Sequence, residues 1–404
     1  MIIIDDKSKC CGCTACYSIC PTKCIEMEID EEGFKYPVVN PDNCLNCGAC
    51  EKVCPVINTP SRDANNPVEA WVARNKDKEI LNASSSGGFY SVIADKFLDE
   101  NGYICGAAYT EDFEVKHLIF DSKDKIEVFR GSKYVQSDII GVFGKIKTLL
   151  DNGNRVCFSG TACQVAGLKN YLKKDYQHLF LIDLVCHGVP SPSLWKEYKK
   201  NISEKYQSKI CKINFRAKTL GYQTPVMQIS FENGKTYEAT GRVDIMLKAF
   251  FSHMSLRPSC FDCPCKGIER CSDITLFDCW NSKELIGIDD NLGQTAVLVQ
   301  TDKGRKFIET LDEDCLLEKV ALEQIIPSNG GGMIVKSAKY TPKRKEFYLN
   351  IKIYGLQQCA RMILGITLKD KIMERMKWMF AYIGIQKNIS RFRRLLQRRV
   401  RKSY

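Results

Sequence analysis

The spacing of apolar and polar residues divides most of the chain into short strands and amphipathic helices. Between about residues 68 and 332, apolar runs of strand length alternate with longer stretches in which apolar residues recur at helical spacing. We expect strands over residues 69–73, 103–109, 154–160 and 179–186, and helices over residues 89–100, 139–153 and 163–174. Strands that alternate with helices in this way are typical of an α/β core.

Other patterns flank this core. Residues 25–39 alternate apolar and polar positions around Gly33, which predicts a β-hairpin. The polar, Pro- and Asn-rich segment 58–67 is typical of a linker. We therefore expect a small N-terminal domain (1–57), the linker (58–67), an α/β domain (68–335) and a basic helical tail (336–404).

Charge is distributed unevenly between the body and the tail. The formal net charge is +11, yet residues 336–404 alone contain 19 Lys and Arg against 3 Asp and Glu. The preceding residues carry 40 basic and 45 acidic side chains, so the body is mildly acidic. This asymmetry indicates an anionic partner for the tail alone, whether a lipid surface, a nucleic acid or an acidic protein.

The 22 cysteines point to metal or redox chemistry. A disulfide scaffold suits short exported chains, whereas this chain has 404 residues and its first residues lack the features of a signal peptide. No apolar run approaches the roughly 18 residues that suggest a membrane span. We therefore expect a protein of the reducing cytoplasm.

Eight cysteines form two copies of one motif. The pattern C-x2-C-x2-C-x3-C-P occupies residues 10–21 and again residues 44–55. It is the bacterial ferredoxin signature, in which three thiolates of one run hold one 4Fe-4S cluster and the fourth holds the other. The first cluster is assigned to Cys10, Cys13, Cys16 and Cys54, and the second to Cys44, Cys47, Cys50 and Cys20. Zinc is the alternative, although zinc motifs seldom place four cysteines in eleven residues.

The N-terminal domain is therefore expected to be an α+β ferredoxin-like domain that passes single electrons. Cys11 and Cys24 fall outside the motif and are interpreted as buried small residues. The chemistry that the electrons serve must lie further along the chain.

Five segments of the α/β domain carry a resemblance to a known family. They are SSSGGFYS (84–91), GSKYVQS (131–137), FSGTACQVAGLKNYL (158–172), DLVCHGVPSPSLW (183–195) and RPSCFDCPCKGIERCSDITLFDCW (257–280). Together they resemble the coenzyme F-420 hydrogenase/dehydrogenase beta-subunit family. The resemblance implies a ferredoxin domain fused to an α/β flavin-binding domain that carries FAD and a third 4Fe-4S cluster.

The resemblance also implies an activity, that of an iron–sulfur flavoprotein oxidoreductase. Electrons would pass from ferredoxin or a similar donor through the clusters to FAD, and on to an acceptor that the sequence does not identify. Members in anaerobic bacteria are often encoded among surface-polysaccharide genes, which implies a small-molecule or glycan-pathway acceptor. The alternative is an electron-transfer subunit of a larger redox complex without its own substrate chemistry. A nucleic-acid partner is not expected, because the flavin segments count against it.

Carried over by position, the family pattern assigns the third cluster to four cysteines from three separate segments, namely Cys163, Cys186, Cys260 and Cys263. A purely local set remains the alternative, made of Cys260, Cys263, Cys265 and Cys271. The choice between the two sets depends on which thiols the fold brings together.

Two loops that lead into helices are candidates for holding the flavin phosphates. The first contains Ser85, Ser86, Gly87 and Gly88, whose hydroxyls and backbone N–H groups suit an anion at a helix start. An ordinary N-cap is the alternative. Gly160 and Thr161 connect a strand to a helix and could face a pyrophosphate in the same way.

Four further residues are candidates for contact with the flavin ring or the acceptor. Lys133 and Tyr134 are expected to cover the isoalloxazine ring, where a cation would stabilise the reduced flavin. Arg270 and Asp273 are expected to contact flavin or acceptor, with an internal ion pair as the alternative. No catalytic residue is assigned.

The tail allows two interpretations. Residues 356–400 mix apolar groups with an Arg-rich run from Arg391 to Arg401, which suits peripheral contact with an anionic membrane at its inner face. The same apolar groups could instead dock on the α/β domain or on a second subunit, which would leave only the final arginines solvated.

Overall fold

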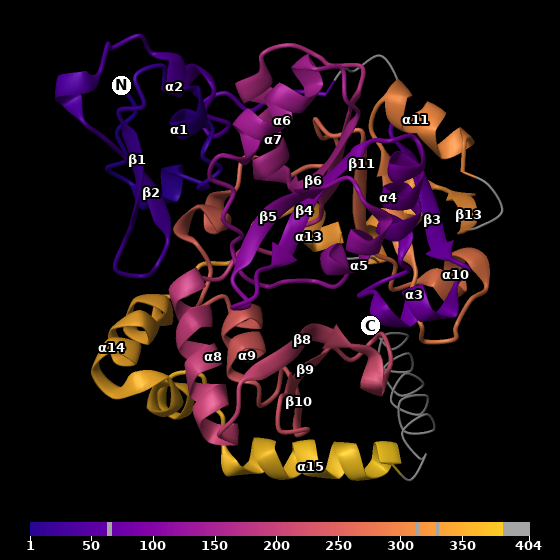
Figure 1. Ribbon diagram of the computed structural model, residues 1–404. Coiled ribbons are helices and arrows are strands. Elements are labelled where there is room, and N and C mark those ends of the chain that lie inside the picture. The colour runs from indigo at the N-terminus through magenta and orange to yellow at the C-terminus, as the bar shows by residue number, and fades with distance from the viewer. Residues whose placement is uncertain (63–66, 312–314, 329–330, 383–404) are drawn as a thin grey trace.

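The computed structural model describes residues 1–62, 67–311, 315–328 and 331–382. The N-terminal unit lies at the upper left of Figure 1 and contains the expected hairpin, in which β1 (Ile25–Ile29) pairs antiparallel with β2 (Lys35–Val39). Two short helices, α1 (Ala15–Ile19) and α2 (Ala49–Lys52), follow the cysteine-rich loops. A ferredoxin-type unit of α+β construction is therefore present.

The body is built on a mixed sheet of eight strands in the order β13-β3-β12-β11-β7-β6-β4-β5. These strands are β3 (Glu69–Asn75), β4 (Tyr103–Tyr109), β5 (Val115–Phe120), β6 (Val156–Thr161), β7 (Leu179–Leu184), β11 (Ile274–Asp278), β12 (Thr295–Val299) and β13 (Cys315–Val320). The neighbours β4, β6, β7 and β11 run parallel. The outer strands pair antiparallel.

The expected strands and helices are present, but the sheet is less regular than a simple α/β alternation. Strand β5 follows β4 after only five residues, which is too short for the crossover that a parallel neighbour needs, so the two strands form an antiparallel pair. Strand β3 lies between the antiparallel strands β12 and β13, far from β4. The parallel core is therefore confined to the middle of the sheet.

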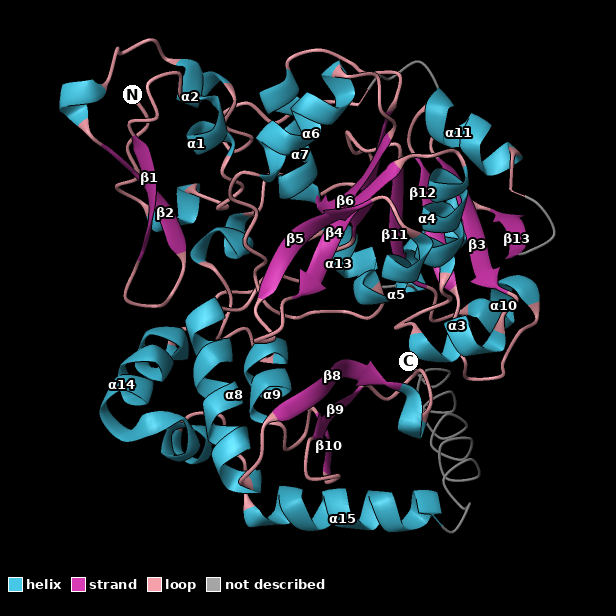
Figure 2. Cartoon of the chain, viewed as in Figure 1, coloured by secondary structure: helices cyan, strands magenta, loops and turns pink. Residues whose placement is uncertain are grey.

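Helices cover both faces of this sheet (Figure 2). On one face, α6 (Val142–Asp151) and α7 (Ala162–Leu172) enclose a core that contains Phe143, Phe158 and Leu168. On the other, α4 (Phe89–Asp99) and α11 (Asp302–Glu309) enclose Phe97, Phe180 and Ile182. Shorter helices complete the body: α3 (Lys78–Ala83), α5 (Ile126–Phe129), α10 (Ser282–Ile286), α12 (Leu322–Ser328) and α13 (Gly331–Val335).

A second, three-stranded sheet lies below the body in Figure 1. Strands β8 (Ile210–Ala217), β9 (Val226–Phe231) and β10 (Thr236–Thr240) are antiparallel, and Gly234 forms the turn between the last two. Helices α8 (Pro192–Tyr206), α9 (Ile245–Phe251) and α14 (Lys343–Met362) pack beside this sheet. Phe34 and Tyr36 of the N-terminal hairpin join the same core, so the ferredoxin-type unit is packed into the body.

The described part of the tail packs on the fold. Helix α15 (Leu368–Tyr382) lies against the three-stranded sheet, where the Glu374 carboxylate accepts hydrogen bonds from the backbone N–H and the hydroxyl of Thr240, each at 2.8 Å. Trp378 and Ala381 pack on Leu220 and its neighbours. Residues 383–404, with the Arg-rich run, lie outside the described residues.

The described helices include none that combines the length and apolarity of a membrane span.

The described part of the expected linker is bound to the body by hydrogen bonds. Asn170 donates to the Asn58 carbonyl at 2.7 Å, and Arg62 donates to the Gln300 carbonyl at 2.6 Å. Residues 63–66 of that linker lie outside the described residues.

Candidate functional site

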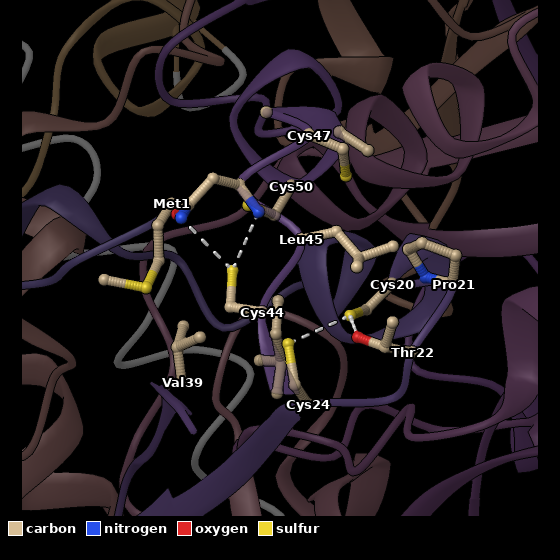
Figure 3. A pocket seen from close by; sticks show the side chains of 14 residues that line it. Met1, Cys20, Pro21, Thr22, Cys24, Val39, Cys44, Leu45, Cys47 and Cys50 are labelled. Atoms are coloured by element: carbon tan, nitrogen blue, oxygen red, sulfur yellow. Dashed lines mark hydrogen bonds between the residues drawn. The ribbon is translucent and has the colours of Figure 1, made fainter. Parts of the chain in front are cut away.

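Four of the motif cysteines of the ferredoxin-type unit line one surface cavity (Figure 3). They are the four assigned to the second cluster, Cys20, Cys44, Cys47 and Cys50. The backbone N–H of Ile2 donates to the Cys50 sulfur, and that of Asn46 donates to the Cys44 sulfur, both at 3.4 Å. Such N–H groups stabilise negative charge on sulfur. Because Cys47 is exposed, this outer site is open to a partner.

Cys24 also lines this cavity. Its sulfur lies 3.4 Å from that of Cys20. The interpretation of Cys24 as a buried small residue is therefore incomplete, because the side chain touches an assigned ligand.

The other four motif cysteines form an inner site. Cys10, Cys13, Cys16 and Cys54 are all buried. The negative charges of Cys10 and Cys54 are among the causes that raise the pKa of the Cys16 thiol to about 12, after the largest cause, which is burial. A thiol of this kind becomes a thiolate only when a metal replaces its proton.

No three Cys, His, Asp or Glu side chains of the described residues are arranged to hold a single ion. A tetrahedral zinc site would need four ligand atoms within about 2.3 Å of one point.

A third group of thiols gathers at the carboxyl edge of the parallel strands. Cys163 lies in the first turn of α7, which directly follows β6, and Cys186 follows β7. Cys260 and Cys263 lie in and directly after a short 3-10 helix (Pro258–Asp262). Burial is the largest cause that raises the pKa of the Cys186 thiol to about 12, and the negative charges of Cys163 and Cys263 also raise it. Cys260 has Cys186, Cys163 and Cys263 as charged neighbours. The fold thus brings together the four dispersed cysteines.

The local alternative is less well supported by this arrangement. Cys265 lies beside the group, and its thiol donates a hydrogen bond that lowers the pKa of Cys263 to about 6. Cys271, by contrast, has Asp183, Lys169 and Arg270 as its charged neighbours. Cys265 is therefore adjacent to the group, whereas Cys271 faces an ion pair.

The third thiol group and the inner site lie against each other. A Cβ atom added at Gly167 of α7 would lie only 2.9 Å from both the Cβ and the sulfur of Cys13. The Cys11 thiol interacts with both Cys13 and Cys163. Sequence reasoning treated Cys11 as packing, yet it occupies the space between the two sites.

Arg257 contacts both sites, since its carbonyl accepts from the Cys260 N–H at 3.0 Å, and it was not found from the sequence. Its side chain is fully buried (0% exposed), and its guanidinium donates to the carbonyl of Cys10 at 2.7 Å, to the sulfur of Cys10 at 3.5 Å and to the carbonyl of Lys35 at 2.9 Å. It stacks 4.2 Å from the Tyr36 ring centre. Only its position just before Cys260 could have indicated such a role.

The Ser85–Gly88 loop uses most of its polar groups inside the protein. The Ser86 hydroxyl donates to the Gln294 carbonyl at 2.5 Å, and the Gly87 N–H donates to the Thr295 hydroxyl at 3.1 Å. The Ser85 hydroxyl accepts from the backbone N–H of Ser132 at 2.7 Å. Gly87 is required by packing, because a Cβ atom there would lie 2.6 Å from the Ala73 carbonyl oxygen and the Thr295 nitrogen.

The second expected phosphate loop is a helix cap. The Thr161 N–H donates to the side-chain oxygen of Gln164 at 2.9 Å in a capping box at the start of α7. The Thr161 hydroxyl also lies 3.3 Å from the Cys163 sulfur. Gly160 and Thr161 are thus placed at the third thiol group.

Lys133 and Tyr134 lie between the body and the unit built on the three-stranded sheet. The Lys133 ammonium donates to the carbonyl groups of Phe129, Arg130 and Gly131 at 3.1 to 3.3 Å, and burial lowers its pKa to about 7. The Tyr134 ring stacks on Phe250 with ring centres 4.4 Å apart.

Arg270 and Asp273 take part in internal ion pairs, though not with each other. Arg270 donates to Asp183 at 2.5 Å, and both side chains are buried. Asp273 accepts from the Leu181 N–H at 2.7 Å and lies 3.3 Å from the Lys303 ammonium. Arg270 also neighbours Cys186 and Cys263, so it acts on the third thiol group.

Buried polar atoms around Ser86 fit an additional bound group. The second guanidinium NH2 of Arg216, the hydroxyl of Tyr222 and the side-chain NH2 of Gln294 have no hydrogen-bond partner among the described residues. Arg216 lies over the Tyr222 ring at 5.6 Å, and the Ser86 hydroxyl donates to the Gln294 carbonyl. The Tyr222 hydroxyl lies close to Ser86 and Asp278 but has hydrogen-bond geometry with neither. Because buried polar atoms are normally satisfied, these three suit a bound polar group.

Comparison with known proteins gives two family matches. Residues 9–58 match a family described as "4Fe-4S dicluster domain". Residues 153–325 match the family that describes the C terminus of the beta subunit of coenzyme F420 hydrogenase/dehydrogenase. No curated protein matches the sequence.

One solved structure with similarity is the F420-reducing NiFe hydrogenase complex from Methanosarcina barkeri. A chain of that complex aligns with 17% identity and a TM-score of 0.43, over 72% of this chain and 91% of the other. That TM-score is too low to establish a common fold.

Proposed function

We propose that this chain is an iron–sulfur oxidoreductase. The premise is that it joins a 4Fe-4S dicluster domain to the C-terminal domain of the coenzyme F420 hydrogenase/dehydrogenase beta-subunit family. The proposal rests above all on the convergence of four cysteines from three segments beside Cys13. A third cluster in that position would stand next to the inner ferredoxin cluster.

The arrangement of thiols defines the order of electron transfer in this proposal. Electrons from ferredoxin or a similar donor would enter at the outer cluster, since Cys47 is exposed. Cys10, Cys13, Cys16 and Cys54 would hold the buried inner cluster, which would receive them next. Cys163, Cys186, Cys260 and Cys263 would hold the third cluster, beside the close approach of Gly167 to Cys13. Such a protein works in a reducing compartment, for which we propose the cytoplasm.

FAD is the proposed terminal group of this chain of cofactors. When bound, FAD supplies the exchange of two single electrons for one hydride. Arg216, Tyr222 and Gln294 would give hydrogen bonds to its polar groups, because each holds a buried atom without a protein partner among the described residues. Ser85 and Ser86 would border the same position. The acceptor beyond FAD is a small molecule or a glycan-pathway intermediate.

Iron analysis tests the third cluster. We expect about 12 iron atoms per chain after anaerobic purification, and Cys186→Ser should remove about four of them. The matched control is Cys265→Ser, which alters a neighbouring thiol that is not an assigned ligand and should keep all the iron. Loss of iron from Cys265→Ser, with none from Cys186→Ser, would replace the dispersed ligand set by the local one.

Flavin analysis tests the second part independently. Purified protein should contain FAD, and Tyr222→Phe should weaken FAD binding by about threefold to tenfold because it removes one hydrogen-bonding group. Tyr36→Phe is the control, since it removes another buried hydroxyl without a partner among the described residues, but beside the inner cluster. Full iron content without FAD would leave an electron-transfer subunit, which should then co-purify with a catalytic partner.

A further inference from the structure

Helix α15 presents an apolar stripe on the side that faces away from the protein. Its inner face packs on the three-stranded sheet, as described above, and in Figure 1 it forms the lower edge of the molecule. The outer face carries four apolar side chains between 41% and 74% exposed: Leu368, Ile372, Met376 and Met379. Their spacing of i, i+4, i+8 and i+11 places them in one line along the helix.

The exposed charges on this helix are all positive. Lys369, Lys371 and Arg375 are exposed and border the apolar stripe. The two acidic residues of α15 are engaged elsewhere: Glu374 is buried against Thr240, and Asp370 lies 3.7 Å from the Arg242 guanidinium. The sequence that follows, residues 383–404, adds eight Lys and Arg and no Asp or Glu.

A cavity of about 120 Å³ lies between α8, α14 and α15. Three cations line it, one from each helix: Lys205, Arg361 and Lys371. None of the described residues that line this cavity is acidic, and its apolar lining includes Ile202, Ile245 and Ile366. The cavity has room for several water-sized atoms, and therefore for one phosphate group.

Charge and apolarity together select the occupant of this surface. A second copy of the chain would bring like charges together, which is unfavourable. A nucleic acid would pair with the cations but would leave the apolar stripe in water. An anionic lipid bilayer satisfies both features, because basic side chains meet its headgroups and apolar side chains enter the acyl boundary.

We propose that α15 is a docking surface for an anionic lipid bilayer, and that the cavity lined by Lys205, Arg361 and Lys371 receives a lipid phosphate. The stripe of Leu368, Ile372, Met376 and Met379 lies in the headgroup region while Glu374 and Trp378 hold the helix on the protein. This surface is separate from the thiol groups and does not depend on the proposed redox function.

Vesicle flotation with the full chain tests the proposal. Vesicles of phosphatidylglycerol and phosphatidylcholine should bind the protein, and vesicles of phosphatidylcholine alone should bind it at least about tenfold more weakly. Two double variants should each reduce binding to the anionic vesicles by about tenfold or more. The first combines Lys371→Glu with Arg375→Glu, and the second combines Ile372→Ser with Met379→Ser. All four side chains are exposed, so the fold and the iron content should not change.

The matched control is Lys145→Glu with Lys173→Glu, which reverses two exposed cations, one on α6 and one directly after α7, away from α15 in Figure 1. This variant should float like the unmodified chain. Equal loss in the control would show that net charge alone causes binding and would overturn the proposal. Flotation that survives both α15 variants would also overturn it, as would a dimer in solution that the Ile372→Ser and Met379→Ser variant dissociates.

Discussion

At the scale of single residues, His117 shows how burial determines a protonation state. Its Nε2 lies 3.1 Å from the Ser159 carbonyl oxygen, which can only accept, so Nε2 carries the proton. Its Nδ1 then accepts from the Ser137 hydroxyl at 2.9 Å. Burial lowers the pKa of His117 to about 4, with Lys133 also lowering it and the Ser159 carbonyl and Asp138 raising it.

This pKa predicts a loss of stability in mild acid. Between about pH 6.5 and pH 4 the unfolded chain binds a proton at this position and the folded chain does not, so stability falls as the pH falls through that range. At about pH 5 the loss is about 2 kcal/mol. In His117→Gln, denaturation midpoints should change less between neutral pH and pH 5 than in the unmodified protein. An equal change in both proteins would contradict the assignment.

At the scale of elements, α7 serves two units at once. Its first turn carries Cys163 beneath the Thr161 cap, and its next turn brings Gly167 against Cys13. A helix is a suitable carrier because its residues i and i+4 lie on the same face. The distance between the inner site and the third thiol group is therefore fixed by one rigid turn.

Two glycine substitutions separate helix propensity from this contact. Gly167→Ala places a methyl group 2.9 Å from Cys13, so it should move the ferredoxin-type unit, lower the stability and reduce the iron retained at the inner cluster. Gly144→Ala on α6 is the control, since its methyl group would lie 4.0 Å from the Tyr171 hydroxyl, an ordinary contact. The control should gain up to about 1 kcal/mol in stability. Thermal unfolding and iron analysis measure both effects, and equal behaviour of the two variants would exclude a special contact.

At the scale of the whole molecule, the ferredoxin-type unit is joined to the body by buried charged groups. Arg344 of α14 forms an ion pair with Glu32 at the turn of the hairpin, and Arg257 donates hydrogen bonds to the carbonyl groups of Cys10 and Lys35. These arginines come from segments more than 200 residues further along the chain than their partners. The two units therefore behave as one body, with the inner site enclosed at their junction.

Arg257 should influence the inner cluster in two ways. Its positive charge and hydrogen bond near the Cys10 sulfur favour the more negative, reduced cluster, so Arg257→Met should lower the reduction potential of one ferredoxin cluster. The variant also leaves buried carbonyl groups unpaired, which should cost about 3 kcal/mol. A redox titration followed by electron paramagnetic resonance measures the first effect. Arg242→Met, at an exposed position, is the control and should change neither quantity; unchanged potentials in Arg257→Met would reject the electrostatic role.

The sequence alone determined the features that depend on neighbours along the chain. Cysteine spacing gave the two ferredoxin motifs, and apolar periodicity gave the hairpin at residues 25–39 and helices such as α4 and α7, because both are local patterns. The resemblance to the beta-subunit family, carried by short distinctive segments, is confirmed by the match over residues 153–325. The flavin contacts and the membrane surface stay predictions.

Only the tertiary structure decided which distant groups meet. It placed Cys163, Cys186, Cys260 and Cys263 together, because the parallel strands β6 and β7 end at one edge of the sheet and the Pro258–Asp262 segment folds over that edge. It paired Arg270 with Asp183 and placed Arg257 at Cys10, contacts between segments that share no local pattern. The described tail likewise divides into a packed face and an exposed face through its contact with Thr240. Such outcomes depend on the path of the whole chain, because burial decides which charge finds which partner and no spacing in the sequence records it.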